Sequence, residues 1–341
     1  MEIYSIKRKK NYFEIIDQTL LPTKEQYITI KDYKDMIKAI KKLRIRGAPA
    51  IGIAAVATAY LACEQFEKDK DYIKLMPNII TEIEQSRPTA VNLFFATQKL
   101  KTILKETPLL WKNKIHTLVD EFMSYEMQAC ENMAINAINI IPKEYSIFLT
   151  HCNTGSLATY GIGTALGVIR KISENNIRFR DNQAIHVYVD ETRPLLQGSR
   201  LTMWELIKSK IDCTLITDNM AAKVISSKGI QAIITGADRI ASNGDTANKI
   251  GTYNLSILAK HFKIPFYIVA PETTIDKNIK SGKEMIIEER NPNEIIKIKD
   301  QFIAPEESKT FNPAFDITPN ELITAIITDK KAYTKPFEFD I

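Results

Sequence analysis

The chain has little cysteine, with four residues in 341, and they lie far apart along the sequence. No two of them form a C-x-x-C pair, so the spacing indicates neither a zinc site nor a disulfide framework. We therefore predict a reducing compartment, the cytoplasm. Cys63, Cys130 and Cys213 fit the role of small buried side chains. Cys152 stands in a different setting.

Long apolar runs and nucleotide-binding motifs are also missing. No apolar run approaches membrane-spanning length, and no apolar signal segment follows the basic N-terminus, so neither a membrane span nor secretion is predicted. The glycines of GIGTALG (161–167) fall inside a predicted helix rather than in a strand-to-helix turn, and G-x-x-x-x-G-K-[ST] is absent. No histidine and acidic residues occur at metal-ligand spacing, so no metal is expected.

Net charge and chain length limit the possible partners and the number of domains. The formal net charge of +5 comes from lysines scattered among acidic residues, not from a basic stripe. This pattern argues against nucleic acid as a partner and suits a cytosolic enzyme with an anionic small-molecule substrate. A chain of 341 residues, 45% of them hydrophobic, is long enough for two domains with a sizeable core.

The first predicted domain, residues 1–142, combines a small antiparallel sheet with a helical bundle. The segments YFEIIDQT and QYITI read as strands around a turn. Apolar residues at helical spacing follow, and Gly47 and Pro49 mark the start of an alanine-rich helix that we expect to pack closely against another backbone. The expected helices span residues 32–43, 49–66, 71–85, 91–105 and 111–141.

The pattern changes at Pro142, and residues 143–341 form the second predicted domain. Strands IFLTH, IHVYVDE, CTLITD, AIITGAD and FYIVAP alternate with helices near 159–174, 197–210, 220–228 and 252–262. This alternation predicts a Rossmann-like, doubly wound parallel sheet, and an α/β fold for the chain. Such sheets bind ligands beyond the carboxyl ends of their strands. We therefore expect Cys152, Asp190, Asp218 and Asp238 to face one crevice.

Two of these residues are candidates for catalysis. Cys152 lies in SIFLTHCNTGSLAT, where a strand turns into a polar loop that we expect to start a helix, a setting that lowers a thiol pKa. His151 should point to the opposite face, as a core or supporting residue. Asp238 follows a strand end and suits a general acid in a partly closed pocket. The alternatives are a buried structural thiol for Cys152 and an ion pair with Arg239 for Asp238.

Other segments suit an anion. Arg46, Gly47 and Ala48 place a guanidinium and bare backbone N–H groups at a helix start, which favours phosphate. Arg87 and Lys249 are candidates to complete this clamp, although either can be a solvated surface charge. Lys249 lies in a polar segment, NGDTANKIGTYN (243–254), that reads as a binding loop. Gln197, at a predicted helix start, serves equally well as a helix cap.

Taken together, these stretches resemble the methylthioribose-1-phosphate isomerase family, which is related to the regulatory subunits of the eukaryotic translation-initiation guanine-nucleotide exchange factor. The matching stretches are IRGAPAIGIAA, SRPTAVNLF, LTHCNTGSLAT, YVDETRPLLQGSRLTMWEL, ITDNMAA, GADRIASNGDTANKIGTYNL, VAPETTID, IEERNP and NPAFDITP. They occur in this order over most of the chain. Departures from the usual family pattern are Thr154, Leu195, Ser156 and Ser199, which bear on substrate preference.

The resemblance implies a homodimeric enzyme that converts S-methyl-5-thio-α-D-ribose 1-phosphate to the corresponding ribulose 1-phosphate, in methionine salvage, without metal or organic cofactor. It implies that Cys152 and Asp238 are catalytic, and that the substrate is bound by Arg46, Gly47, Ala48, Arg87, Gln197, Asn248 and Lys249. Two alternatives remain. One is an isomerase of another pentose 1-phosphate, such as 5-deoxyribose 1-phosphate or ribose 1,5-bisphosphate. The other is a non-catalytic subunit of the exchange factor.

Overall fold

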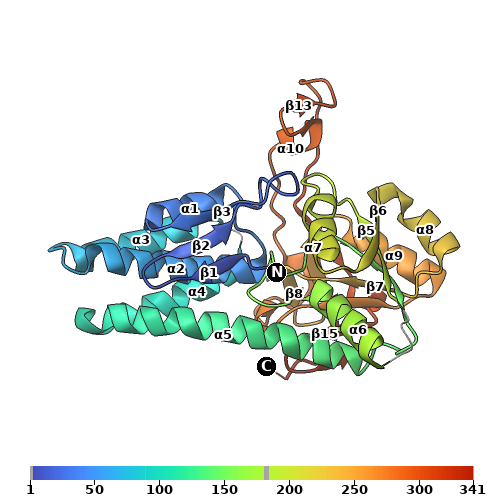
Figure 1. Ribbon diagram of the computed structural model, residues 1–341, viewed down its shortest axis with the longest axis horizontal. Coiled ribbons are helices and arrows are strands. Elements are labelled where there is room, and N and C mark those ends of the chain that lie inside the picture. Colours follow the sequence, from blue (N-terminus) through green and yellow to red (C-terminus); the bar gives the residue numbers. More distant parts are fainter. Residues whose placement is uncertain (1–2, 89, 180–183, 341) are drawn as a thin grey trace. The chain divides into compact units, whose positions relative to one another are not determined.

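A computed structural model describes residues 3–88, 90–179 and 184–340 (Figure 1). The chain divides into two compact units, Met1–Glu131 with Thr154–Gly163, and Asn132–Asn153 with Thr164–Ile341. The sequence did not predict that residues 154–163 belong to the first unit. The predicted domain limit between residues 142 and 143 stays a prediction. Each unit is described by itself below.

The first unit contains a small antiparallel sheet and helices, as predicted. The sheet has the order β1-β2-β3, with β1 at Ile6–Arg8, β2 at Phe13–Ile16 and β3 at Tyr27–Ile30. The helices are α1 (Tyr33–Lys41), α2 (Ala48–Phe66), α3 (Tyr72–Ser86), α4 (Val91–Ile103) and α5 (Trp111–Ile138), the last of which continues into the second unit. Helix α1 begins at its cap, Asp32, whose carboxylate accepts from the Lys34 N–H at 2.7 Å.

Helix α2 is the core helix of this unit. A Cβ on Gly52 would lie 3.2 Å from the carbonyl oxygen of Asn92 in α4, so the predicted close packing against another backbone is confirmed. By length and composition alone, α2 is long and apolar enough to cross a membrane. The expectation that no apolar run approaches membrane-spanning length is therefore wrong for this helix. Of the most apolar 18-residue stretch of α2, 78% is buried in the structure, as in the core helix of a folded domain.

A mostly parallel sheet forms the centre of the second unit. Its order is β16-β15-β10-β7-β4-β5-β6, and neighbouring strands are parallel except for β15 and β16. The strands are β4 (Ile147–Thr150), β5 (His186–Asp190), β6 (Asp212–Ile216), β7 (Ala232–Thr235), β10 (Phe266–Val269), β15 (Ala325–Ile327) and β16 (Ala332–Thr334). Strands β7 and β10 are buried at every residue, as expected for central parallel strands covered on both faces.

This unit includes the helices α6 (Ala165–Phe179), α7 (Met203–Lys208), α8 (Ala221–Lys228) and α9 (Thr252–Phe262), and a π-helical turn, η2 (Gly198–Thr202), precedes α7. Helix α6 starts later than the expected residue 159. Gly161 and Gly163 therefore precede the helix instead of lying inside it, and Gly163 has a φ of +106° that a helix does not allow. The expectation that the polar loop after Cys152 forms the start of a helix near residue 159 is therefore wrong.

A second, four-stranded sheet was not predicted. Its order is β11-β8-β9-β14, with β8 at Arg239–Ala241, β9 at Thr246–Lys249, β11 at Ile275–Asp276 and β14 at Phe315–Thr318. The segment 243–254, expected to be a loop, therefore includes a strand. The strands are two to four residues long, too short for a clear alternating pattern. Figure 1 also shows a projecting arm with α10 (Asn293–Ile296), β12 (Lys297–Ile298) and β13 (Gln301–Phe302).

We expect Asp245 to stabilise this sheet in a pH-dependent way. Its carboxylate accepts from Gly282 N–H at 2.9 Å, from the Asn243 side chain at 3.0 Å, and from Asn320 N–H at 2.9 Å. Burial opposes ionisation, but these hydrogen bonds outweigh it and lower the pKa of Asp245. After allowance for solvent screening, Asp245→Asn should cost about 1 kcal/mol in free energy of unfolding at neutral pH.

The sign of the pH effect follows from the lowered pKa. The stabilisation is fully present above the unfolded-state value of about 3.9 and is lost as the pH falls through the folded-state pKa below it. Urea unfolding of wild type and variant should give a constant difference from pH 7 to 5 that shrinks below about pH 4. Asp300→Asn, at an exposed turn of the arm, is the control. A difference that widens in acid contradicts the prediction.

Candidate active site

The candidate residues of the second unit follow the carboxyl ends of neighbouring parallel strands. In the order β7-β4-β5-β6, each strand pairs in parallel with the next. Asp190 ends β5, while Cys152 follows β4, Asp218 follows β6 and Asp238 follows β7. Parallel strands end at the same edge of a sheet, so the expectation that these residues follow strands at one edge is confirmed. That they share one crevice stays a prediction.

The strand order reverses between β4 and β7. From β4 the chain adds β5 and then β6 on one side, and it then returns to add β7, β10 and β15 on the other side. Cys152 and Asp238 follow the two strands at this reversal. In open α/β sheets the crevice beyond such a reversal is where ligands bind.

Cys152 is buried, with 8% of its surface exposed, and its backbone has a φ of +62°. No helix starts here, so the expected helix N-terminus cannot act on the thiol. Its backbone N–H donates to the Thr192 hydroxyl at 2.8 Å, and its carbonyl oxygen accepts from the Thr202 hydroxyl at 2.6 Å. Side chains from two other segments therefore hold the backbone of the candidate thiol.

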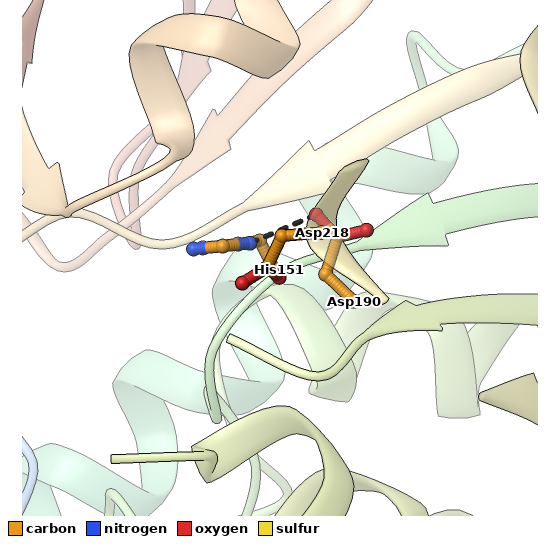
Figure 2. A group of neighbouring side chains, drawn as sticks. All are labelled: His151, Asp190 and Asp218. Carbon is orange, nitrogen blue, oxygen red and sulfur yellow. Dashed lines mark hydrogen bonds and ion pairs between the residues drawn. The ribbon is translucent and has the colours of Figure 1, made fainter. Parts of the chain in front are cut away.

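His151 is buried and engaged on both ring nitrogens, as expected for a supporting residue. Nδ1 lies 2.9 Å from Asp190 Oδ2 (Figure 2). Nε2 lies 2.9 Å from the carbonyl oxygen of Ile250. A carbonyl oxygen only accepts, so Nε2 carries a proton. Burial alone would lower the pKa of His151, but the hydrogen bond and charge of Asp190 outweigh it and raise that pKa.

Figure 2 also shows Asp218 beside this pair, and the three side chains are close enough to hold a metal ion. Sequence spacing did not reveal the cluster, because its members lie on three different strand ends. Asp218 accepts from the backbone N–H groups of Thr192 at 2.8 Å and Arg193 at 2.7 Å. His151 has no ring nitrogen left for a metal. We therefore interpret the cluster as a hydrogen-bonded support for the loop after β5.

A second buried network includes Asn153, the residue that follows Cys152. The Asn153 side chain donates to Glu205 Oε1 at 2.8 Å, and Arg170 donates to Glu205 Oε2 at 2.7 Å. Glu205 is fully buried, so its charge depends on these partners. Neither Asn153 nor Glu205 was a sequence candidate. Asn153 has an uncharged amide without acid–base function. Glu205 lies inside the predicted helix 197–210, where charged residues are ordinarily solvated.

Asp238 is half-buried, and its backbone N–H donates to the carbonyl oxygen of Ala247 at 2.9 Å. The neighbouring Arg239 places Nε 4.0 Å from Asp276 Oδ2. Partial burial agrees with the environment that a general acid needs.

The predicted binding residues of this unit lie next to η2 and on β9. Gln197 immediately precedes η2 and makes no side-chain cap, which weighs against its capping alternative. Its amide oxygen is buried without a hydrogen-bond partner among the described residues. On β9, the buried Asn248 side chain donates to the Thr252 hydroxyl at 2.9 Å, and Lys249 donates to the carbonyl oxygen of Ala314 at 2.8 Å.

The remaining predicted binding residues belong to the first unit. Gly47 precedes α2 with a φ of +94°, and a Cβ there would lie 2.5 Å from the Cα of Ala158, so only glycine fits. Ala48 begins α2, and Arg46 Nε donates to the Gln18 side chain at 3.3 Å. Arg87 follows α3 and is half-buried.

The comparisons with known proteins agree with this arrangement. The model of the initiation factor 2 subunit family matches residues 44–335. The chain belongs to this family. Within the family, methylthioribose-1-phosphate isomerase from Caldicellulosiruptor saccharolyticus is 49% identical over 96% of this chain and 95% of the relative. The resemblance noted in the sequence is therefore confirmed.

Two solved structures that match this chain are named for different functions. A crystal structure of 5-methylthioribose 1-phosphate isomerase from Pyrococcus horikoshii OT3 matches with a TM-score of 0.90 and 36% identity, covering 99% of this chain and 94% of that one. A structure of translation initiation factor eIF-2B subunit delta from A. fulgidus matches with a TM-score of 0.86 and 37% identity, covering 98% and 97%. Proteins with either name therefore share this fold.

We predict that removal of one member of the buried His151–Asp190 pair strongly destabilises the protein, because its partner stays buried without a hydrogen bond. His151→Leu would leave the Asp190 carboxylate and the Ile250 carbonyl group buried without their partner, and should cost about 3–5 kcal/mol in free energy of unfolding. The measurement is urea unfolding followed by circular dichroism.

The chain supplies a matched control for this prediction. His186 and Asp212 form the same type of pair at 2.8 Å, but their side chains are 26% and 73% exposed. His186→Leu should cost less than about 1 kcal/mol. An equal loss of unfolding free energy in the two variants would show that burial of the pair does not determine the cost of breaking it.

Proposed function

We propose that this chain is a methylthioribose-1-phosphate isomerase. It is an aldose–ketose isomerase that converts S-methyl-5-thio-α-D-ribose 1-phosphate to S-methyl-5-thio-D-ribulose 1-phosphate. Relatives that bear this enzyme name match the chain almost from end to end, including one from Thermoanaerobacter at 45% identity over 100% of it. The proposal also includes a homodimer that acts in the cytoplasm and requires neither metal nor organic cofactor.

One observation carries the assignment of the active site: Cys152 and Asp238 follow β4 and β7, the adjacent parallel strands at which the strand order reverses. We infer that the parallel sheet is Rossmann-like and doubly wound, because its parallel strands follow the 3-2-1-4-5-6 order. In that fold the reversal is the ligand site. A thiol and a carboxyl group delivered there from two strands suit a small reacting centre.

The substrate explains why such groups are needed. Phosphate on the anomeric oxygen prevents the sugar from opening to a free aldehyde. The usual enediol route starts from that aldehyde and is therefore disfavoured. Protonation of the ring oxygen breaks its bond to C1 and leaves C1 electron-poor. The hydrogen on C2 then moves to C1 with its electron pair, and the C2 hydroxyl loses its proton to become the ketone.

In this scheme Asp238 donates the proton to the ring oxygen. Cys152 stabilises the cationic transition state or, in an enediolate route, removes the C2 proton. The buried position of Cys152 favours the hydride shift, because exclusion of water protects an electron-poor carbon. Deuterium from solvent appearing at C1 of the product would argue for the enediolate route instead.

Substrate binding is assigned to Arg46, Gly47, Ala48, Arg87, Gln197, Asn248 and Lys249. The support for Gln197 is its buried amide oxygen, an acceptor that suits a substrate hydroxyl. Lys249 is partly fixed by the Ala314 carbonyl oxygen and lies 4.5 Å from the centroid of the Phe315 ring, so its charge is held in place. Cationic residues of this kind suit the phosphate.

We predict that Cys152→Ser and Asp238→Asn each lower kcat by about 100- to 10,000-fold while substrate binding persists, because both groups act on the reacting carbons. Ketose formation is measured by a colorimetric or coupled assay, and binding by calorimetry. The controls are Cys213→Ser and Asp212→Asn, which change the same residue types on β6. Near-normal kcat in either test variant would remove that residue from the mechanism.

Arg87→Ala should act on binding instead. Loss of a charged contact to phosphate is expected to raise KM by about tenfold or more with a smaller change in kcat. Lys74→Ala, which removes an 83% exposed cation from α3, the helix that Arg87 follows, should leave both constants unchanged. An unchanged KM in Arg87→Ala would take Arg87 out of the phosphate clamp.

Similarity to the A. fulgidus initiation-factor subunit favours a second candidate function, a non-catalytic subunit of an exchange factor. The presence of both Cys152 and Asp238 supports the enzyme, since a scaffold has no chemical use for the pair. Incubation of the pure protein with methylthioribose 1-phosphate, 5-deoxyribose 1-phosphate and ribose 1,5-bisphosphate separates the possibilities. Ketose from the first substrate alone supports the proposal, ketose mainly from another identifies a different isomerase, and no turnover favours the scaffold.

A further inference from the structure

The backbone of Cys152 has a conformation that an unsupported cysteine avoids. Its φ of +62° lies in the left-handed region, where the Cβ of any residue other than glycine crowds the following carbonyl group. Cys152 also lies beyond β4, so no strand ladder fixes this conformation. A strained residue of this kind persists only where its surroundings determine it.

Two threonine hydroxyls hold the backbone of Cys152 in this conformation. Thr192 accepts from the N–H of Cys152 at 2.8 Å, and Thr202 donates to its carbonyl oxygen at 2.6 Å. The two main-chain polar groups of one residue are thus bound by side chains from two segments, the loop after β5 and the π-helical turn η2. Both threonines are buried, with 0% and 1% exposed surface, so water does not compete for these bonds.

The loop after β5 is itself fixed at several points. The Thr192 hydroxyl donates to the carbonyl oxygen of Asp190 at 3.1 Å, and the Thr192 N–H donates to Asp218 at 2.8 Å. The start of η2 packs directly on the end of β5, where a Cβ on Gly198 would lie 1.7 Å from the Asp190 carbonyl oxygen. Thr192 therefore belongs to a rigid frame built on the central sheet.

Thr202 is fixed from the other side. Its hydroxyl accepts from the side chain of Asn153 at 3.2 Å, and the same Asn153 amide donates to Glu205 at 2.8 Å. Each threonine hydroxyl therefore both donates and accepts, which leaves it a single orientation. Irregular π-type turns inside helices occur often at functional sites, and here the turn carries Thr202 to the backbone of Cys152.

We propose that Thr192 and Thr202 are positioning residues that hold Cys152 in its left-handed conformation and so direct its thiol. This inference rests on the proposed role of Cys152 in catalysis. Without the two hydroxyls the turn relaxes toward negative φ, which rotates the Cα–Cβ bond and moves the sulfur. A displacement of about 1 Å at a reacting group costs up to about 100-fold in rate.

The test compares Thr202→Val with Thr202→Ser, and Thr192→Val with Thr192→Ser. Valine keeps the shape of threonine without the hydroxyl, and serine keeps the hydroxyl. Each valine variant should lower kcat about 10- to 100-fold with little change in KM, and each serine variant should restore most of the lost kcat. Thr58→Val is the control, since Thr58 is a buried threonine whose hydroxyl donates to the carbonyl oxygen of Ala54 within α2.

The outcomes separate this inference from the proposed function. If Cys152→Ser is inactive while both valine variants keep normal kcat, the positioning role is wrong and the assignment of Cys152 stands. If Cys152→Ser keeps normal kcat, the assignment of Cys152 fails and the positioning inference fails with it. Equal losses in valine and serine variants would indicate a packing role and overturn the inference.

A second measurement does not depend on turnover. If the frame imposes a positive φ at this position, Cys152→Gly should unfold at higher urea concentration than Cys152→Ala, because glycine accepts this conformation without strain. This reverses the usual order, in which the flexibility of glycine makes it the less stable variant. An alanine variant that is the more stable of the two would overturn the inference.

Discussion

The parallel pairing of β4 with β5 on one side and β7 on the other is the constraint on which the rest of this structure depends. It brings together strand ends that come from distant parts of the chain and gives them a common edge. Each strand ends in a residue with a reactive or polar side chain, or just before one. Backbone hydrogen bonds within a buried sheet hold this arrangement more firmly than surface loops hold theirs.

Buried polar contacts then fix what the sheet brings together. His151 joins the end of β5, through Asp190, to the residue after β9, through the Ile250 carbonyl oxygen. The four-stranded sheet, which carries Asn248 and Lys249, is thereby tied to the strand that delivers Cys152. Buried charged groups are costly unless fully paired, so such a network determines one arrangement more than it adds stability.

The family relationship separates fold from function. One solved structure named as an isomerase and one named as an initiation-factor subunit share this architecture at 36% and 37% identity to the chain. The fold alone therefore does not choose between the two functions, and particular side chains add to the choice. Cys152 and Asp238 matter for this reason, and the two threonines around Cys152 matter because they hold its backbone.

The sequence by itself determined the alternation of strands and helices after Pro142, the antiparallel sheet and helices before it, and the candidate residues at strand ends. Hydrophobic periodicity and glycine or proline punctuation are local signals, and these elements are local. It misplaced the start of α6 because Gly161 and Gly163 resemble helix-packing glycines. Only the tertiary structure decided that Thr192 and Thr202 bind the backbone of Cys152. It also decided that Glu205 binds the Asn153 side chain and that His151 joins Asp190. These contacts join residues 39 to 52 positions apart, and no local pattern records which side chains the fold brings together.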